Sequence, residues 1–366
     1  MMSNQELEAI TPEIGEAQIA LLERLCNACG VSGDEGEVRQ IVLEEVRPHA
    51  DQVKVDALGN VLVTKAGQGE NRLRVMLAAH MDEVGFMLTD DDEEGIFRFD
   101  TVGGLNPQHL VGKPVWVGEQ HLPGVIGAKP IHLTTADERR QKVSLDSLRI
   151  DVGPGNGKKV QVGDRATFAT SFAHLGASLR AKALDDRFGV ASLIELVKHA
   201  PPNIDLLAAF TVQEEIGLRG ARVAAYALDP QLAFVLDCTP ANDLPLWDTD
   251  DGRIDNTRYN TRLGAGPAIY LADSSTLSDP RLARHLIQTA DSAGIPYQIR
   301  QPGGGGTDAG AIHKQRLGIP SITVSVPGRY MHTAAAIARL EDWQHTYALI
   351  YQALLRLTPD ILAGER

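Results

Sequence analysis

Hydrophobic and polar positions follow two recurring patterns along most of the chain. Short apolar runs of strand length are separated by segments whose apolar residues recur every three or four positions, which is the spacing of a helix with one buried face. The helical pattern is clearest in residues 183–200. The strand-like runs are RVMLAAH (74–80), DLLAAFT (205–211), QLAFVLD (231–237) and SITVSVP (321–327). Strands that alternate with helices form a mostly parallel sheet covered on both faces, so we predict an α/β fold.

Residues 86–176 depart from this pattern. Short strand-like stretches are separated here by Gly, Pro, Asp and Asn, and helical spacing is limited to a piece near residues 136–147. This pattern is typical of a small β-barrel or sandwich. We therefore expect one α/β domain made of residues 1–85 and 177–366, interrupted by an inserted β-barrel domain of residues 86–176.

Side chains that bind metal ions lie at or just past the ends of the four strand-like runs. They are His80 and Asp82 for the first run, Glu214 and Glu215 for the second, Asp237 for the third and His332 for the fourth. The carboxyl ends of parallel strands meet at one edge of the sheet, where active sites of open α/β folds lie. Ionised carboxylates are costly there unless a cation or a donor compensates them. Together these residues predict a carboxylate-rich dinuclear metal site.

The residue types indicate which ions the site would bind. His80 and His332 offer neutral imidazoles, whereas Asp237 and one of the two adjacent glutamates offer carboxylates. Mixed nitrogen and oxygen ligands suit zinc, cobalt or manganese, while calcium and magnesium sites are mostly oxygen. Two such ions about 3.5–4 Å apart, holding a water molecule, would explain why so many carboxylates converge.

Finer roles follow only in part from the local sequence. Asp185 begins a helix beside a second aspartate, so it either caps that helix or bridges two metal ions. One glutamate of the Glu214–Glu215 pair binds metal while the other takes a proton from water and passes it to a leaving amine, and periodicity does not distinguish them. Asp82 is spaced to accept the second ring N–H of His80 and fix its tautomer.

Composition narrows the class of protein. The 366 residues carry a formal net charge of −13, which argues against nucleic acids and anionic membranes as partners, since these bind basic surfaces. No apolar run approaches the roughly 20 residues that span a bilayer. The acidic N-terminal segment lacks the pattern of a secretory signal. We therefore expect a cytoplasmic protein.

The three cysteines do not make a disulfide framework. Cys26 and Cys29 have the C-x-x-C spacing of some redox and metal motifs, but they lie in an amphipathic helix pattern with no second Cys or His pair nearby. Because cysteine is among the residues most often buried, we expect both side chains to face the core.

Six motifs occur in the same order as in one known family. They are AAHMDEVGF, KALDDRFG, EEIGLRGA, the aspartate of VLDCT, GGTDAGAI and RYMH. On these motifs the chain resembles the tetrahedral, self-compartmentalising metallo-aminopeptidases, the deblocking and glutamyl aminopeptidase family, over nearly its whole length. The resemblance implies a phosphorylase/hydrolase-like catalytic domain for the α/β part and a dimerisation role for the inserted β-barrel.

The resemblance also implies a role for each candidate residue. Asp185, rather than Asp186, would bridge two metal ions. The implied metal ligands are His80, Asp185 and Asp237 for one ion, and Asp185, Glu215 and His332 for the other. The implied catalytic residues are Glu214, as general base, and Asp82, which orients His80.

Enzymes of this family use zinc or cobalt and remove N-terminal residues from peptides. We therefore expect a dinuclear aminopeptidase that acts through metal-activated water on peptides with a free N-terminus. Each subunit of a homododecamer built from dimers would hold two divalent ions, Zn²⁺ or Co²⁺, with Mn²⁺ as a further candidate. The alternatives are a related metal-dependent deacylase or carboxypeptidase, and a catalytically idle homologue that still assembles into the oligomeric shell. Cys238, Thr239 and the loop Gly303–Gly306 are expected to border the substrate pocket.

Overall fold

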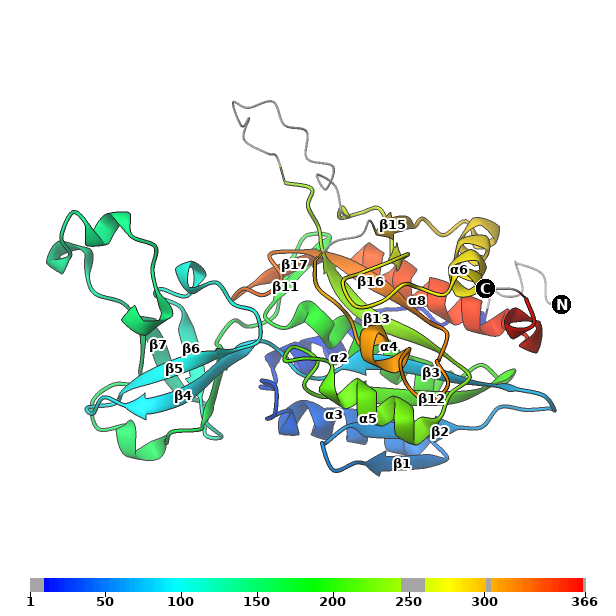
Figure 1. Ribbon diagram of the computed structural model, residues 1–366, viewed down its shortest axis with the longest axis horizontal. Coiled ribbons are helices and arrows are strands. Elements are labelled where there is room, and N and C mark those ends of the chain that lie inside the picture. Colours follow the sequence, from blue (N-terminus) through cyan, green and yellow to red (C-terminus); the bar gives the residue numbers. More distant parts are fainter. Residues whose placement is uncertain (1–9, 245–260, 301–303, 365–366) are drawn as a thin grey trace.

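The computed structural model describes residues 10–244, 261–300 and 304–364. The larger part of the chain is built on a single sheet of 11 strands, and a separate closed barrel projects from one end of it (Figure 1). The predicted α/β fold with an inserted β-barrel is confirmed. No helix within the described ranges is long and apolar enough to cross a membrane.

The centre of the large sheet consists of four parallel neighbours, in the order β12, β3, β13 and β16. Their bounds are Ile204–Thr211 for β12, Leu73–His80 for β3, Leu232–Pro240 for β13 and Ser321–Arg329 for β16. The register places Thr211, the last residue of β12, opposite His80, the last residue of β3. The carboxyl ends of the strands therefore meet at one edge, as the sequence predicts.

The outer strands make the sheet mixed rather than mostly parallel. On one side β12 pairs antiparallel with β2, and β2 with β1; on the other side β16, β17, β11 and β10 pair antiparallel in turn. Beside β16, β14 pairs with β15. The bounds are Gln52–Val55 (β1), Val61–Lys65 (β2), Ala173–Leu175 (β10), Ser178–Ala181 (β11), Ala268–Tyr270 (β14), Gln298–Arg300 (β15) and Ala336–Arg339 (β17).

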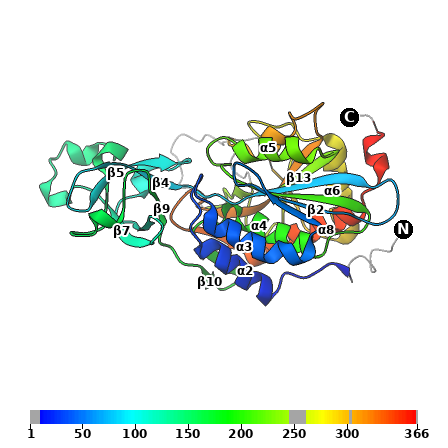
Figure 2. The same ribbon diagram turned by 90° about the horizontal axis from the view of Figure 1, so that it is seen from below.

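Helices cover both faces of the sheet, as Figure 2 shows with α5 on one side and α2, α3 and α4 on the other. Alternate residues of β3 face the two layers: Leu77 lies in the core beneath α2, α3, α4, α6 and α8, whereas Ala78 lies in the core beneath α5 and α7. The bounds are Glu16–Asn27 (α2), Gly36–Val46 (α3), Leu184–Lys198 (α4), Arg219–Leu228 (α5), Pro280–Ala293 (α6), Ala309–Ile312 (α7) and Leu340–Leu355 (α8).

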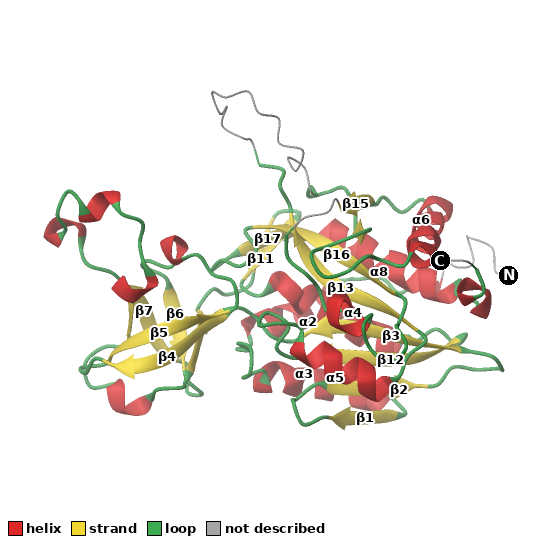
Figure 3. Cartoon of the chain, in the orientation of Figure 1, coloured by secondary structure: helices red, strands yellow, loops and turns green. Residues whose placement is uncertain are grey.

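The barrel closes in the strand order β4, β5, β8, β7, β6 and β9 (Figure 3). Its strands are Gly85–Asp91 (β4), Ile96–Val102 (β5), Pro114–Val117 (β6), Leu122–Gly127 (β7), Arg149–Asp151 (β8) and Arg165–Phe168 (β9). Its core is aromatic: the ring of Phe86 meets those of Phe99 and Phe168 edge-on, each with centroids 5.2 Å apart. Within the predicted insertion 86–176, β10 does not join the barrel but pairs in the large sheet.

A buried ion pair lies at the junction between the barrel and the α/β part. The Lys182 ammonium lies 2.7 Å from one carboxylate oxygen of Glu83, and both side chains are only 2% exposed. Thr167, on barrel strand β9, donates its hydroxyl to the other oxygen of Glu83 at 2.9 Å. The backbone N–H of Gly30, between α2 and α3, donates to the same carboxylate. One carboxylate thus joins three parts of the fold.

Candidate metal centre

The predicted site residues gather in one cavity of about 480 Å³ at the carboxyl edge of the parallel strands. Six of them line it: His80, Asp185, Glu214, Glu215, Asp237 and His332. The seventh, Asp82, is fully buried and contacts His80 from behind, with its Oδ1 3.5 Å from Nδ1 of the imidazole. Residues separated by up to 252 positions in the chain, His80 and His332, thus meet because β3, β12, β13 and β16 end side by side.

Asp185 lies between the two histidines. Its Oδ1 is 3.3 Å from Nε2 of His80, and its Oδ2 is 3.6 Å from Nε2 of His332. On one side of it, Oδ1 of Asp237 lies 3.9 Å from Nε2 of His80. On the other side, Oε2 of Glu215 lies 3.4 Å from Nε2 of His332. The donor atoms therefore form two neighbouring groups that share one carboxylate.

The adjacent Asp186 makes different contacts. Its Oδ1 accepts the backbone N–H of Gly189 at 2.9 Å, and its Oδ2 accepts the backbone N–H of His80 at 3.2 Å. The first of these bonds caps the start of α4, where Asp185 and Asp186 themselves have non-helical backbone angles. Although its oxygens also lie near His80 and Asp237, both are already engaged by amides. The capping role considered for Asp185 thus falls to Asp186, and a metal-bridging role for Asp185 stays a prediction.

Asp82 holds the backbone of the paired glutamates. Its carboxylate accepts the N–H of Glu214 at 2.9 Å and the N–H of Glu215 at 3.2 Å, and it accepts the hydroxyl of Ser32 at 2.6 Å. Its backbone carbonyl oxygen is 3.2 Å from Nδ1 of His80, closer than either carboxylate oxygen. Asp82 therefore orients His80 through its main chain as well as its side chain. Nothing in the sequence spacing signals the contact with Ser32 or with the glutamate amides.

His332 receives its orientation from outside the α/β part. Its Nδ1 lies 2.9 Å from the carbonyl oxygen of Gly104, which follows β5 of the barrel. Sequence reasoning missed this partner, because a backbone carbonyl leaves no residue signature. The only available signal is the Gly103–Gly104 pair at the end of a strand-like run.

Three buried carboxyl groups of the cavity resist ionisation in this arrangement. Burial raises the pKa of Glu214 and of Asp237 well above ordinary carboxyl values, and raises that of Glu215 to about 7. Burial would also raise the pKa of Asp185, but the facing imidazoles of His332 and His80 lower it. Burial alone would lower the pKa of His332, but the facing carboxylates of Asp185 and Glu215 raise it to about 10. The cavity holds more carboxyl groups than imidazoles, so their joint ionisation needs added positive charge.

These residues fit a pair of divalent cations. Oδ1 of Asp185 is buried and has no hydrogen bond among the described residues, which is the position of an oxygen that binds a cation. The donor set of two imidazoles and three carboxylates is the mixed nitrogen and oxygen set of zinc-type ions. Two positive ions would also compensate the buried carboxylates.

The cavity continues past the two donor groups toward Arg300, which is 3% exposed and lies over the ring of Tyr270, with its guanidinium carbon 4.3 Å from the ring centroid. Cys238 and Gly304–Gly306 line this part, as predicted; Gly303 lies outside the described residues. Thr239 does not line it but accepts the Nε–H of Arg300 at 3.2 Å.

Comparison with known proteins gives one consistent result. The sequence profile described as M42 glutamyl aminopeptidase matches residues 59–349. A putative aminopeptidase of Acetivibrio thermocellus is 34% identical over 93% of this chain and 99% of its own length. A TET aminopeptidase of the marine sediment archaeon Thaumarchaeota archaeon SCGC AB-539-E09 superposes with a TM-score of 0.89 at 33% identity, covering 95% of this chain and 99% of the other. The TET1 peptidase of Pyrococcus horikoshii, which can assemble into a tetrahedron or a large octahedral shell, superposes with a TM-score of 0.80 at 35% identity over 93% and 100%.

Proposed function

The chain belongs to the M42 glutamyl aminopeptidase family and is an aminopeptidase of the metal-dependent class, and from that premise we propose that it works with two divalent ions and Glu214 as general base. The observation that carries this proposal is the position of Asp185, whose two carboxylate oxygens face the two histidines separately. A single carboxylate shared by two donor groups is what a dinuclear centre needs.

We assign His80 and Asp237 to one ion and Glu215 and His332 to the other, with Asp185 between them. Zinc and cobalt both suit these donors, and manganese is a further candidate. When bound, the two ions supply a Lewis acid for the peptide carbonyl and lower the pKa of a water molecule.

Glu214 is left free of this ligand set and lines the same cavity. Its backbone is fixed by the hydrogen bond to Asp82, and burial raises the pKa of its carboxyl group well above the ordinary value. A base whose pKa is shifted toward neutrality can both accept and return a proton. Glu214 takes a proton from the attacking water and gives it to the leaving amine as the C–N bond breaks.

The family supports a substrate with a free N-terminus, because the relatives named above are aminopeptidases. Acetylation of the peptide removes the free α-amine that such an enzyme recognises. A peptide with a free N-terminus should therefore be cleaved, and its acetylated twin should not.

The decisive experiment is the Glu214→Gln variant, because glutamine keeps the shape of the side chain but cannot take the proton. We expect turnover to fall by roughly 10²–10⁴-fold while the metal content, measured by mass spectrometry, stays near two ions per chain. Substantial peptidase activity in this variant would contradict the assignment. Cleavage of only the acetylated twin would favour a deacylase.

Chelation tests the remaining alternative. If the chain were an idle scaffold, chelator would change nothing in a peptidase assay. We expect instead that chelator abolishes activity and that Zn²⁺ or Co²⁺ restores it.

We also infer a homododecamer built from dimers, because the P. horikoshii TET1 peptidase can assemble into a tetrahedron. The barrel is the proposed dimerisation domain, and it exposes Ile131 and Leu133, which are 71% and 61% accessible in the single chain. Light scattering on the purified protein measures the subunit number; a dimer is the alternative. A cytoplasmic location stays a prediction.

A further inference from the structure

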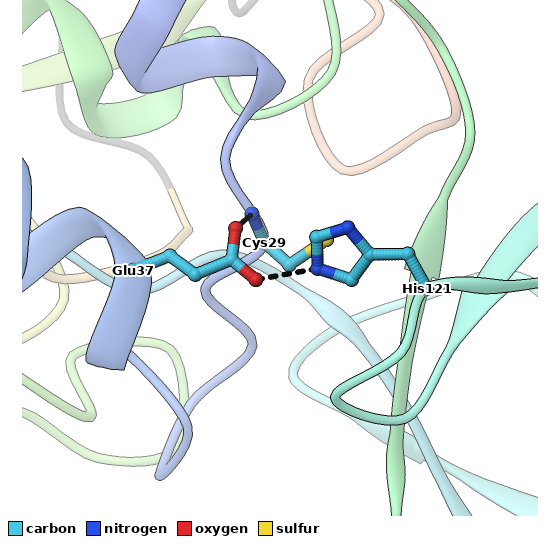
Figure 4. A group of neighbouring side chains, drawn as sticks. All are labelled: Cys29, Glu37 and His121. Carbon is cyan, nitrogen blue, oxygen red and sulfur yellow. Dashed lines mark hydrogen bonds and ion pairs between the residues drawn. The ribbon is translucent and has the colours of Figure 1, made fainter.

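A second group of metal-binding side chains lies where the barrel meets α2 and α3, outside the cavity described above. It consists of Cys29, Glu37 and His121. Figure 4 shows the three side chains pointing toward one another, with Glu37 and Cys29 on one side and His121 on the other. One donor atom from each, a sulfur, an oxygen and a nitrogen, lies within 4.8 Å of the other two.

The three residues come from both parts of the fold. Cys29 lies two residues after Asn27, the last residue of α2, and Glu37 lies in the first turn of α3. His121 belongs to the turn between barrel strands β6 and β7, at a positive φ of 48°. The turn therefore carries the imidazole from the barrel to the α2–α3 connection of the α/β part.

The C-x-x-C motif is divided by this arrangement. Cys26 is fully buried in the main core, as predicted, whereas Cys29 is only partly buried and borders a cavity of about 310 Å³. The expectation that both cysteines face the core is therefore wrong for Cys29. Two residues after the end of a helix, the chain has turned and the thiol faces the barrel.

Glu37 positions the other two residues. Its Oε2 accepts the backbone N–H of Cys29 at 3.0 Å, and its Oε1 lies 2.5 Å from Nε2 of His121. As an ion pair alone, this contact would contribute little to the stability of the fold, because the side chains of His121 and Glu37 are 41% and 43% exposed. An ion pair between Glu37 and His121 also does not explain why the thiol of Cys29 lies beside both side chains.

We propose that Cys29, Glu37 and His121 bind a zinc-type divalent ion that links the barrel to the α/β part. Thiolate, imidazole and carboxylate are the three ligand types of protein zinc sites, and three protein ligands leave a fourth position for water. All three residues line the cavity, whose lining also includes Asp34 and Glu119. On binding, the thiol of Cys29 releases one proton to solvent and the imidazole binds in its neutral form.

The sulfur distinguishes this site from the proposed catalytic one. The ligands assigned in the main cavity are nitrogen and oxygen only, so a Co²⁺ ion there gives no thiolate-to-metal charge transfer. A Co²⁺ ion bound by Cys29 does. Cys238 also lines the main cavity, so near-ultraviolet absorption that is lost on substitution of Cys29 is what reports the second site. The measurement uses the intact metal-loaded enzyme and needs no activity assay.

The first experiment is a Co²⁺ titration of the wild-type protein, Cys29→Ser and the matched control Cys26→Ala. We expect a charge-transfer band in the wild type and in Cys26→Ala, saturating at one ion per chain, and its loss in Cys29→Ser. A wild-type protein without the band would overturn the proposal. So would a band that survives in Cys29→Ser.

The second experiment tests the contribution of the barrel. His121→Gln keeps the thiolate, so the band should remain but require at least about 10-fold more free Co²⁺. His132→Gln, which changes another histidine of the inserted segment, is the control and should titrate like the wild type. Equal titration midpoints for the two variants would show that the barrel contributes no ligand, and the proposed link between the two parts would be wrong. Competition with Zn²⁺ should remove the band at lower concentration than Mg²⁺.

Discussion

The carbonyl oxygen of Gly104 accepts a hydrogen bond of 2.9 Å from Nδ1 of His332, although the two residues are 228 positions apart. A carbonyl oxygen only accepts, so the proton of the neutral ring lies on Nδ1 and Nε2 is free to bind a metal ion. Gly104 belongs to the segment that leads out of barrel strand β5. The inserted domain therefore sets the tautomer of a residue in the proposed metal centre.

Substitution of Gly104 should weaken that centre. A Cβ atom at this position would lie 3.3 Å from Nδ1 of His332, so the ring must move. We expect Gly104→Ala to lower the affinity for metal about 10-fold, with activity recovered by excess metal. The matched control is Gly127→Ala in β7, where the nearest atom would be 3.9 Å away. Equal metal titrations for the two variants would contradict this role.

Asp82 should be sensitive to substitution, because each of its carboxylate oxygens accepts a backbone N–H. An asparagine has one acceptor oxygen, so its NH₂ group would face a backbone N–H of Glu214 or Glu215, both of which now donate to the carboxylate. We expect Asp82→Asn to reduce kcat/KM by about 10–100-fold. Ser32→Ala removes only the hydroxyl partner of Asp82 and should cost much less. If Ser32→Ala lowers kcat/KM as much as Asp82→Asn does, the role given to the Asp82 carboxylate is wrong.

The Lys182–Glu83 ion pair at the junction of the barrel and the α/β part should behave as a buried one. Lys182→Met leaves the Glu83 carboxylate buried without its nearest cation, and Arg187 remains at 3.5 Å. We expect a loss of about 3 kcal/mol in the free energy of unfolding. Adding Glu83→Gln to Lys182→Met should restore part of it, because the stranded charge is gone. Thr167→Val removes one hydrogen bond to Glu83 and should cost about 1 kcal/mol. Denaturant unfolding measures the free energy of unfolding of all three variants.

One surface pair gives a prediction for acid pH. Arg329 donates to both carboxylate oxygens of Asp243, at 2.6 and 2.9 Å. Partial burial would raise the pKa of Asp243, but the hydrogen bonds from Arg329 lower it below the ordinary 3.8. The stabilisation is therefore present above pH 3.8 and is lost as pH falls through the lower folded-state pKa.

The variant Asp243→Asn should thus be less stable than the wild type by about 1 kcal/mol at neutral pH, since the pair is partly exposed to solvent. The difference should shrink to nothing in strong acid. The exposed residue Asp100, changed to Asn, is the control for loss of one charge. A difference that stays constant from neutral pH to pH 3 would show that ionisation of Asp243 is not its cause.

Parts of the fold could be predicted from the sequence for physical reasons. Four buried strands read as continuous apolar runs, and parallel pairing brings their carboxyl ends together, so the polar residues at His80, Glu215 and Asp237 had to be neighbours. The antiparallel outer strands could not be predicted. β10, β11 and β17 are three or four residues long, and their pairing depends on distant partners. Residues 307–318, TDAGAIHKQRLG, also have a helical pattern, but only Ala309–Ile312 form a helix, and Arg316 and Gly318 beyond it have positive φ.

The candidate site, like the fold, could be predicted from the sequence only in part. Residue type and position at a strand end indicated the side chains that gather in the cavity, but not which of Asp185 and Asp186 caps the helix. That distinction depends on two backbone amides that reach only Asp186. Cys29 could not be associated with His121 for a similar reason. The histidine lies on a barrel turn whose position follows from the packing of two domains.

The parallel centre of the sheet also fixes when the proposed metal centre can exist. The chain is made from its N-terminus, so β3, β12 and β13 leave the ribosome before β16, and His332 follows β16. A growing chain can therefore fold its barrel and three of the four central strands while one imidazole is still missing. Peptide cleavage would begin only once synthesis is nearly complete, which keeps half-made copies from digesting peptides around the ribosome.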